Sequence, residues 1–219
     1  MRFLKLLLAL LLGLTAGTAM AQAKRDWRAV VTPTSTGTWV IGNPAAKVKL
    51  VEYLSYTCPH CADFVAESKP VLMDEFVRSG TVSLEVRHAV RDGLDLAAAM
   101  YARCAGPRNF AAVHGLVFAN QKALLDKAVS IAPPPGGDRD AALRTIADGS
   151  GLTTLVRARL PKAPAACLTD AATRDQLIAG TRAAFDKIAG TPSFELDGEL
   201  IQGTDWARLE PRLRAAGAR

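Results

Sequence analysis

Residues 48–61 read VKLVEYLSYTCPHC and carry two cysteines directly after a run of strand-forming residues. Valine, leucine and tyrosine dominate the first part of this segment, which predicts a buried β-strand. Pro59 suits the first position of a helix, where its missing N–H needs no partner. Apolar residues then recur at helical spacing, and Pro70 is expected to kink the helix. The pattern therefore places Cys58 at the start of a helix and Cys61 one turn further in.

This position favours the thiolate form of Cys58 over the thiol. The first N–H groups of a helix, here those of His60 and Cys61, have no partner within the helix and can donate to the sulfur. The helix N-terminus also carries a partial positive charge, and both effects lower the pKa of a cysteine thiol. His60 adds a further donor or positive charge, or shapes the choice of partner at the surface. We therefore expect Cys58 to be the attacking thiol and the less exposed Cys61 to be the resolving one.

A lowered pKa also indicates the direction of the reaction. If the pKa of Cys58 falls by about 3 units, at roughly 1.4 kcal/mol per unit, the reduced form gains about 4 kcal/mol. For a two-electron couple this gain raises the reduction potential by roughly 90 mV. Such a site is stable when reduced and gives its disulfide away, so it is expected to oxidise client thiols.

A C-x-x-C pair can also be half of a zinc site, which needs two further ligands at similar spacing. The other two cysteines, Cys104 and Cys167, are isolated in the sequence, and His88 and His114 are the only histidines outside the motif. We therefore expect redox chemistry at sulfur, with no metal and no cofactor.

The rest of the chain combines few strands with many helices. Residues 82–90 predict a second strand, residues 92–190 look predominantly helical, and two β-prone runs flank the hairpin signal Asp197-Gly198. A last helix is expected over residues 205–216. A strand–helix–strand unit implies parallel pairing, whereas the closing hairpin adds antiparallel strands. The sequence thus predicts an α/β fold with one mixed sheet and a helical insertion between its halves.

Residues 1–21 have the pattern of a secretory signal peptide. Arg2 and Lys5 form a short basic start, an apolar run follows, and small residues up to Ala21 supply a cleavage site. The alternative is an uncleaved membrane anchor, but glycine and threonine dilute the second half, and a spanning helix needs about 20 predominantly apolar residues. We expect cleavage after Ala21 and export, followed by an irregular N-terminal arm over residues 22–37.

The charge pattern argues against nucleic-acid binding. Lys and Arg number 27 and Asp and Glu number 21, for a formal net charge of +6. The basic residues are scattered and form no stripe with interleaved aromatics, which is the pattern that nucleic-acid binding favours. We therefore expect a solvated basic surface and no nucleic-acid partner.

Four features together resemble the DsbA-like thiol:disulfide oxidoreductases of the bacterial periplasm, which belong to the thioredoxin superfamily. They are the Cys58-Pro59-His60-Cys61 motif, Glu52 on the preceding strand, the Thr191-Pro192 pair and the helical insertion. The resemblance covers roughly residues 38–219. It implies a thioredoxin fold in two halves, residues 38–91 and 190–219, with an inserted helical domain over residues 92–189.

The resemblance also implies roles for single residues. Pro192 matches a cis-proline that leaves the backbone of Thr191 free to pair with an extended client chain close to Cys58, and the alternative is an ordinary trans proline. Glu52 matches a buried acidic residue that accepts or relays the proton of Cys61, and the alternative is an exposed strand carboxylate.

The expected function is that of a periplasmic oxidase. It would donate the Cys58–Cys61 disulfide to unfolded or reduced exported proteins through a mixed disulfide, and a DsbB-like membrane protein would reoxidise it. Thr191 before the proline also resembles the disulfide isomerases, which are dimers with a separate dimerisation domain. The chain before the first strand is too short for such a domain, so we expect a monomer. Isomerase or reductase activity and a non-catalytic thioredoxin-fold binding protein are the alternatives.

Cys104 and Cys167 both lie in the expected insertion. An even number of cysteines in an exported chain indicates disulfides. We expect a structural disulfide between these two, which would stabilise the fold by roughly 4 kcal/mol in the chain-entropy model. The alternative is a second redox pair that tunes the first.

Overall fold

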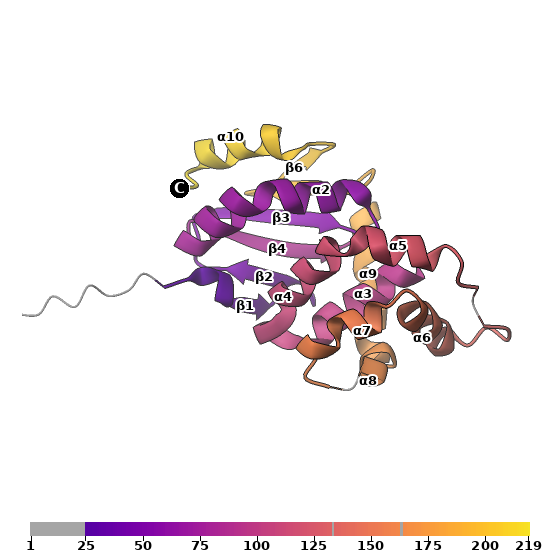
Figure 1. Ribbon diagram of the computed structural model, residues 1–219. Helices are drawn as coiled ribbons and strands as arrows, with labels where there is room; N and C mark the ends of the chain where they lie inside the picture. Colours follow the sequence, from indigo (N-terminus) through magenta and orange to yellow (C-terminus); the bar gives the residue numbers. More distant parts are fainter. Residues whose placement is uncertain (1–24, 133, 163) are drawn as a thin grey trace, which may run out of the picture.

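The computed structural model describes residues 25–132, 134–162 and 164–219 (Figure 1). The expected signal peptide, residues 1–21, lies outside the described residues, as does the start of the N-terminal arm. Across the described ranges, no helix combines the length and the apolar character that crossing a membrane demands.

The centre of the molecule is a six-stranded mixed sheet with the order β1-β2-β4-β3-β5-β6. Strands β3 and β4 run parallel, and every other neighbouring pair is antiparallel. The parallel pair arises because the helix after β3 returns the chain to the same end of the sheet. The strands are β1 (Val31–Pro33), β2 (Trp39–Gly42), β3 (Val48–Leu54), β4 (Val82–His88), β5 (Ser193–Leu196) and β6 (Glu199–Gln202).

Helices cover both faces of this sheet. Phe64 of α2 (Pro59–Ser68) packs against Phe194 of β5 and against Trp206 of α10 (Trp206–Ala216), so these two helices share one face. On the other face, Ala184 of α9 (Ala171–Phe185) joins a buried cluster with Val51. This arrangement confirms the α/β fold class with a mixed sheet flanked by helices.

The chain between β4 and β5 is helical, which confirms the expected insertion (Figure 1). Asp138 caps one of these helices, accepting hydrogen bonds from the N–H groups of Asp140 and Ala141, as its position before a helical run predicts. The elements are α3 (Gly93–Cys104), α4 (Gly106–Ala119), α5 (Gln121–Ala128), α6 (Arg139–Gly149), α7 (Leu152–Val156), η3 (Arg157–Arg159), α8 (Pro164–Leu168) and α9.

Two local expectations need correction. The arm over residues 22–37 is not wholly irregular, because η1 (Trp27–Ala29) and β1 lie within it. Strand β1 pairs with β2, and an unpaired edge of that kind readily accepts a short strand. Around Pro70 the helical path continues, but from Lys69 to Val77 (η2) the bonding pattern is that of a π-helix. Proline has no N–H for the α-helical bond, and the wider turn accommodates this loss.

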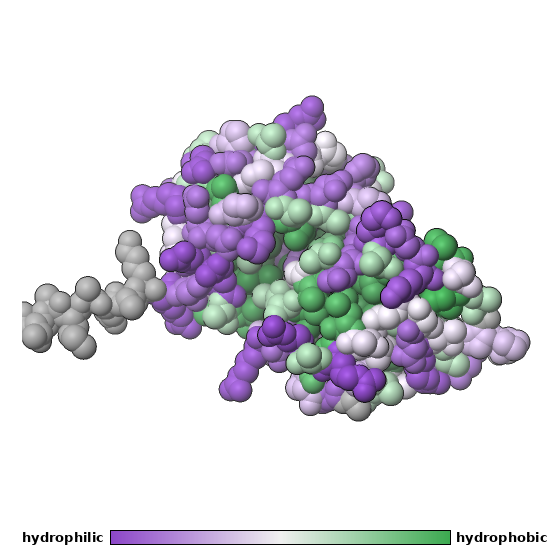
Figure 2. All heavy atoms as spheres, in the orientation of Figure 1, coloured by the Kyte–Doolittle hydropathy of each residue, from purple (hydrophilic) through white to green (hydrophobic). Residues whose placement is uncertain are grey.

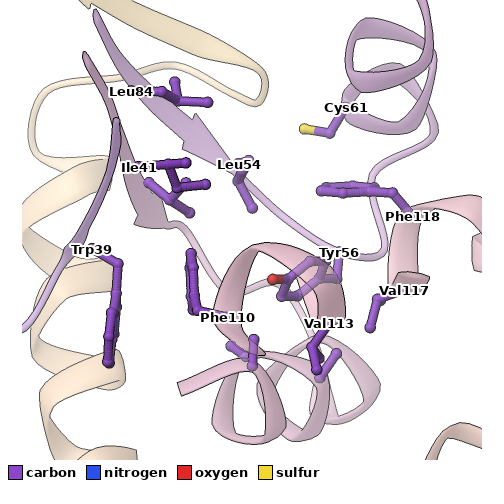
Figure 3. Close-up of a cluster of buried hydrophobic side chains, with 14 of the residues drawn as sticks. Trp39, Ile41, Leu54, Tyr56, Cys61, Leu84, Phe110, Val113, Val117 and Phe118 are labelled. Atoms are coloured by element: carbon purple, nitrogen blue, oxygen red, sulfur yellow. The ribbon is translucent and has the colours of Figure 1, made fainter. Parts of the chain in front are cut away.

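The sheet and the inserted helices share one hydrophobic core (Figure 3). Trp39 of β2 stacks on Phe110 of α4 with ring centroids 5.1 Å apart. Tyr56, just after β3, contacts Phe118 of α4 with centroids 5.0 Å apart. The insertion therefore packs directly against the segment that carries the cysteines, and this contact positions the site.

Candidate active site

The segment between β3 and α2 places Cys58 at the N-cap of α2, as the sequence predicts. Its backbone is extended, and its carbonyl accepts hydrogen bonds from the N–H groups of Cys61 (3.1 Å) and Ala62 (3.3 Å). The expected capping bonds from the helix to the Cys58 sulfur do not form. The Cys58 sulfur lies 3.2 Å from the carbonyl oxygen of Thr191, to which it donates a hydrogen bond only when it carries a proton.

Both cysteines of the motif are reduced and buried. Cys58 retains 3% of its exposure and Cys61 none, so Cys61 is the less exposed of the two, as expected. Cys61 projects from α2 into the core near Leu54 and Phe118 (Figure 3). A partner thiol can therefore approach Cys58 more readily than Cys61.

The electrostatics of the two thiols are opposite. The pKa of Cys58 falls from 9.0 to about 5, chiefly because the Cys61 thiol donates a hydrogen bond to its thiolate. The Thr191 hydroxyl, the Cys61 backbone N–H and the charge of Arg91 act in the same direction, while burial opposes them. The Cys61 N–H lies close to the sulfur without the geometry of a capping hydrogen bond. The pKa of Cys61 is raised by its hydrogen bond to Cys58, by burial and by the charge of Glu52.

These opposite shifts distinguish the two sulfurs chemically. At neutral pH the Cys58 sulfur is a thiolate, which is the nucleophilic form and also a good leaving group. Cys61 stays protonated until Cys58 is engaged in another bond. The pair therefore has the polarity of an attacking and a resolving cysteine.

Glu52 lies on β3 and is 1% exposed, so the alternative of an exposed strand carboxylate is wrong. Its Oε1 atom is buried without a hydrogen-bond partner among the described residues. Burial raises its pKa from 4.5 to about 8, so the carboxyl group is mostly protonated at neutral pH. When it is ionised, its charge raises the pKa of Cys61.

A cavity of about 420 Å³ leads from the surface to Glu52. It lies between α2, η2 and α4, where Figure 2 shows apolar side chains gathered on the surface. Its wall includes the apolar side chains of Val65, Leu72 and Met73 and the buried ring of His114. Glu52 therefore borders this cavity, although its side chain is only 1% exposed.

Thr191 and Pro192 are more than a hundred residues from the cysteines in the chain, and the fold brings them together. The Thr191–Pro192 peptide bond is cis, so the alternative of a trans proline is wrong. The loop lies against Cys58 through the contact to the Thr191 carbonyl. A cavity of about 690 Å³ opens beside it, with His60, Pro192 and Trp206 among its lining residues. His60 is exposed at the rim of this cavity.

Sequence reasoning missed the polar groups that hold the segment before Cys58. Asp95 is fully buried and accepts a hydrogen bond from the Tyr56 N–H at 2.8 Å. Gln121 donates to the carbonyl oxygens of Tyr56 and Cys58, each at 2.9 Å. The N-cap Asp92, whose side chain also accepts from Thr57 Oγ1, could have been found from its place before a helical run. Gln121 gives no such signal, because only the packing of α5 brings it to the site.

Cys104 and Cys167 form a disulfide that ties the end of α3 to α8, with Cα atoms 5.6 Å apart. This pairing uses both remaining cysteines, so neither can join the C-x-x-C pair as a zinc ligand. Within the described ranges, no cluster of three or more His, Cys, Asp or Glu side chains is arranged to hold a metal ion.

Comparison with known proteins agrees with this geometry. A family model described as thioredoxin matches residues 34–213. The crystal structure of a protein-disulfide isomerase from Novosphingobium aromaticivorans superposes with a TM-score of 0.73 and 34% identity, over 80% of this chain and 95% of that one. Wolbachia pipientis alpha-DsbA1 shares the fold with a TM-score of 0.63 at 21% identity, over 84% and 92% of the two chains.

Among curated proteins, a Rickettsia bellii protein named as a protein-disulfide oxidoreductase is 31% identical over 163 residues. The match covers 73% of this chain and 56% of that protein, so the chain spans little more than half the length of this relative. The chain belongs to the thioredoxin family. Its fold, with helices inserted between β4 and β5, agrees with the expected DsbA-like architecture.

Proposed function

We propose that this protein is a thiol:disulfide oxidoreductase that donates the Cys58–Cys61 disulfide to reduced client proteins. The observation that carries the proposal is the opposite displacement of the two thiol pKa values, downward for Cys58 and upward for Cys61. A thiol pair with one stabilised thiolate favours its own reduced form, and it therefore favours transfer of its disulfide to a client.

The transfer proceeds in two exchanges. A client thiolate attacks the Cys58 sulfur, a client–Cys58 disulfide forms, and the Cys58–Cys61 bond breaks. The electron pair of that bond goes to Cys61, which takes a proton from the protonated carboxyl group of Glu52. A second client thiolate then attacks the first client sulfur and releases Cys58 as a thiolate. The client loses two electrons and gains a disulfide, and the cysteine pair of the protein is left reduced.

Client binding is assigned to the surface around Cys58. The cavity of about 690 Å³ beside Thr191 and Pro192 offers apolar side chains and backbone groups to an extended chain. His60 borders this cavity and would contact the client or another partner there. Both features support recognition of unfolded polypeptide rather than of one fixed sequence.

The cellular setting is proposed from the N-terminal sequence pattern and the family resemblance. Residues 1–21 would direct export to the periplasm, where the protein would act as a monomer on exported clients. A DsbB-like membrane protein would accept the two electrons and restore the disulfide. The chemistry takes place between sulfur atoms, so the proposal includes no metal and no cofactor. Residues 22–37 would form the N-terminal arm. The two halves of the thioredoxin domain would be residues 38–91 and 190–219, and the helical insertion would be residues 92–189.

The name of the Novosphingobium protein favours isomerisation as the second candidate function. Redox titration distinguishes the two. The purified protein is equilibrated in graded glutathione buffers, and mass spectrometry after alkylation follows Cys58–Cys61 separately from Cys104–Cys167. A Cys58–Cys61 potential well above the glutathione range supports the oxidase. A potential close to that of thioredoxin overturns the oxidase and favours an isomerase or reductase.

Activity on a reduced, unfolded client distinguishes catalysis from simple binding. We expect Cys58→Ala to abolish disulfide formation in the client and Glu75→Gln, an exposed change on η2, to leave it unchanged. If the Cys58→Ala protein retains full function in the cell, the protein acts by binding, without catalysis.

A further inference from the structure

A third cavity, of about 200 Å³, lies between the sheet and α9. Arg103 from the last turn of α3 and His88 from the end of β4 line it, with Gln176 of α9 opposite. The lining residues include neither cysteine of the motif nor the Thr191–Pro192 loop. At about 30 Å³ for each water molecule, this volume accommodates an ion of a few non-hydrogen atoms.

The donors that line this cavity are not satisfied by the protein. The Nε and Nη1 atoms of Arg103 are buried and have no hydrogen-bond partner among the described residues. His88 is 3% exposed, and neither of its ring nitrogens has a partner there. Buried polar groups are nearly always hydrogen-bonded in folded proteins, so unpaired donors on one cavity wall indicate a ligand or solvent partner.

The charges around the cavity do not cancel. Arg87 pairs with Glu85 at 2.7 Å and with Glu195 at 3.6 Å, and Lys187 pairs with Glu195 at 3.2 Å. In the part of the chain that the structure describes, Arg103 forms no ion pair with a carboxylate. Three cations therefore face two carboxylates, and the remaining positive charge is that of Arg103.

This remaining charge is costly unless something compensates it. Burial lowers the pKa of Arg103 to about 10, so the guanidinium stays charged at neutral pH in an environment that disfavours charge. Its place in the last turn of α3 gives it a weak favourable interaction with the helix dipole, but that interaction leaves its N–H groups unpaired. An anion would supply both the opposite charge and the missing acceptors.

The loop between β1 and β2, whose Thr36 and Thr38 line the cavity, passes close to Gln176 and Arg103 because it has a glycine there. Gly37 has φ of 78°, and a Cβ there would lie 2.9 Å from Gln176 Oε1 and 3.5 Å from Arg103 Nη1. The loop backbone therefore approaches the guanidinium closely without a side chain that fills the cavity.

We propose that this cavity is a binding site for a small oxyanion, either a carboxylate or an inorganic oxyanion, held by Arg103. The planar guanidinium offers two parallel N–H groups, which match the two oxygens of such an anion. His88 and Gln176 line the same cavity, and each has an N–H group that can serve as a further donor. The proposal is independent of the thiol chemistry at Cys58.

The test uses the purified protein with acetate and sulfate as probes, each against chloride at matched ionic strength. Thermal unfolding is followed as a function of anion concentration, because an anion that binds only the folded state raises the melting temperature in a saturable way. The variant is Arg103→Gln, and the matched control is Arg182→Gln, which removes one exposed positive charge from α9.

We expect at least one probe to raise the melting temperature of the unchanged protein and of Arg182→Gln in a saturable way. The probe that does so identifies the class of anion. Arg103→Gln should weaken the apparent affinity by about ten-fold or more. Equal responses of the unchanged protein and Arg103→Gln to both probes overturn the proposal.

Because Arg103→Gln could fail to fold, a second measurement needs no variant. Crystals of the unchanged protein grown with selenate should show an anomalous peak beside Arg103. Water alone at that place overturns the proposal.

Discussion

Replacement of Glu52 by glutamine removes a carboxyl group that is buried in the core and whose charge raises the pKa of Cys61. The pKa of this carboxyl is about 8 in the folded protein against an ordinary value of 4.5. The folded state therefore favours the protonated form, whereas the unfolded chain releases the proton above pH 4.5. As the pH rises from 4.5 towards 8, ionisation stabilises the unfolded state alone, and Glu52 lowers the free energy of unfolding over this window.

The size of this effect follows from the shift. About 3.5 pKa units at 1.36 kcal/mol per unit amount to about 5 kcal/mol at pH 8 and above, and to about 3 kcal/mol at pH 7. The Glu52→Gln protein should lack this loss. An amide in the same place has its own hydrogen-bonding cost, but that cost does not vary with pH. The prediction is therefore that the difference in free energy of unfolding between the two proteins changes as the pH rises.

The assay is guanidinium unfolding of the oxidised proteins between about pH 4 and about pH 9. The oxidised state is used because Cys58 does not titrate in it. Glu75→Gln, the exposed change on η2, is the control and should follow the unchanged protein throughout. If the stabilities of the Glu52→Gln and unchanged proteins differ by a constant amount over the whole range, the carboxyl group is not held protonated and its proposed role as proton donor fails.

Three further predictions concern the cysteines. Cys104→Ser combined with Cys167→Ser should lower the free energy of unfolding by roughly 4 kcal/mol, because the bond closes a long loop in the unfolded chain; an unchanged denaturation midpoint would contradict the structural role, and a shifted Cys58 potential would indicate redox coupling. Thr191→Val should raise the pKa of Cys58 by about one unit or more, since it removes a hydrogen bond to a charged group, and thiolate absorbance against pH measures it. The reduced protein should gain stability over the oxidised one as the pH rises from about 5 towards 9, because the folded state holds Cys58 as a thiolate in that window; parallel pH profiles of the two forms would refute this.

Local sequence signals were sufficient for the position of the cysteine pair. A run of β-formers, a cysteine at the N-cap and proline at the first helical position are properties of adjacent residues, and each acts through backbone conformation. The same holds for the hairpin at Asp197-Gly198 and for the Asp138 cap, both of which the structure contains. The Thr191–Pro192 pair required the family resemblance, because its distance from Cys58 in the chain gives no physical reason to join them. Glu52 is only six residues before Cys58, but its local sequence does not show that its side chain is buried.

Other features could not be read from local sequence. The strand at Val31 forms because the edge of β2 is open to it, and the π-helical turns around Pro70 depend on how the helix packs. The hydrogen bonds of Asp95 and Gln121 to the segment before Cys58 join residues from three elements. No periodicity marks such contacts, because they depend on the relative placement of helices.

By itself, the sequence predicted that the pKa of Cys58 is lowered and that Cys61 is the less exposed sulfur, because Cys58 precedes a helix and Cys61 lies one turn inside it. It also determined the fold class, since the order of strands and helices allows few topologies. Only the tertiary structure decided the pKa values at the site, because the desolvation of each group depends on how completely distant segments of the chain exclude water from it. Burial raises the pKa of Glu52, and the contact of Thr191 lowers that of Cys58. The unpaired charge of Arg103 likewise exists only because α3, α9 and the sheet close around it.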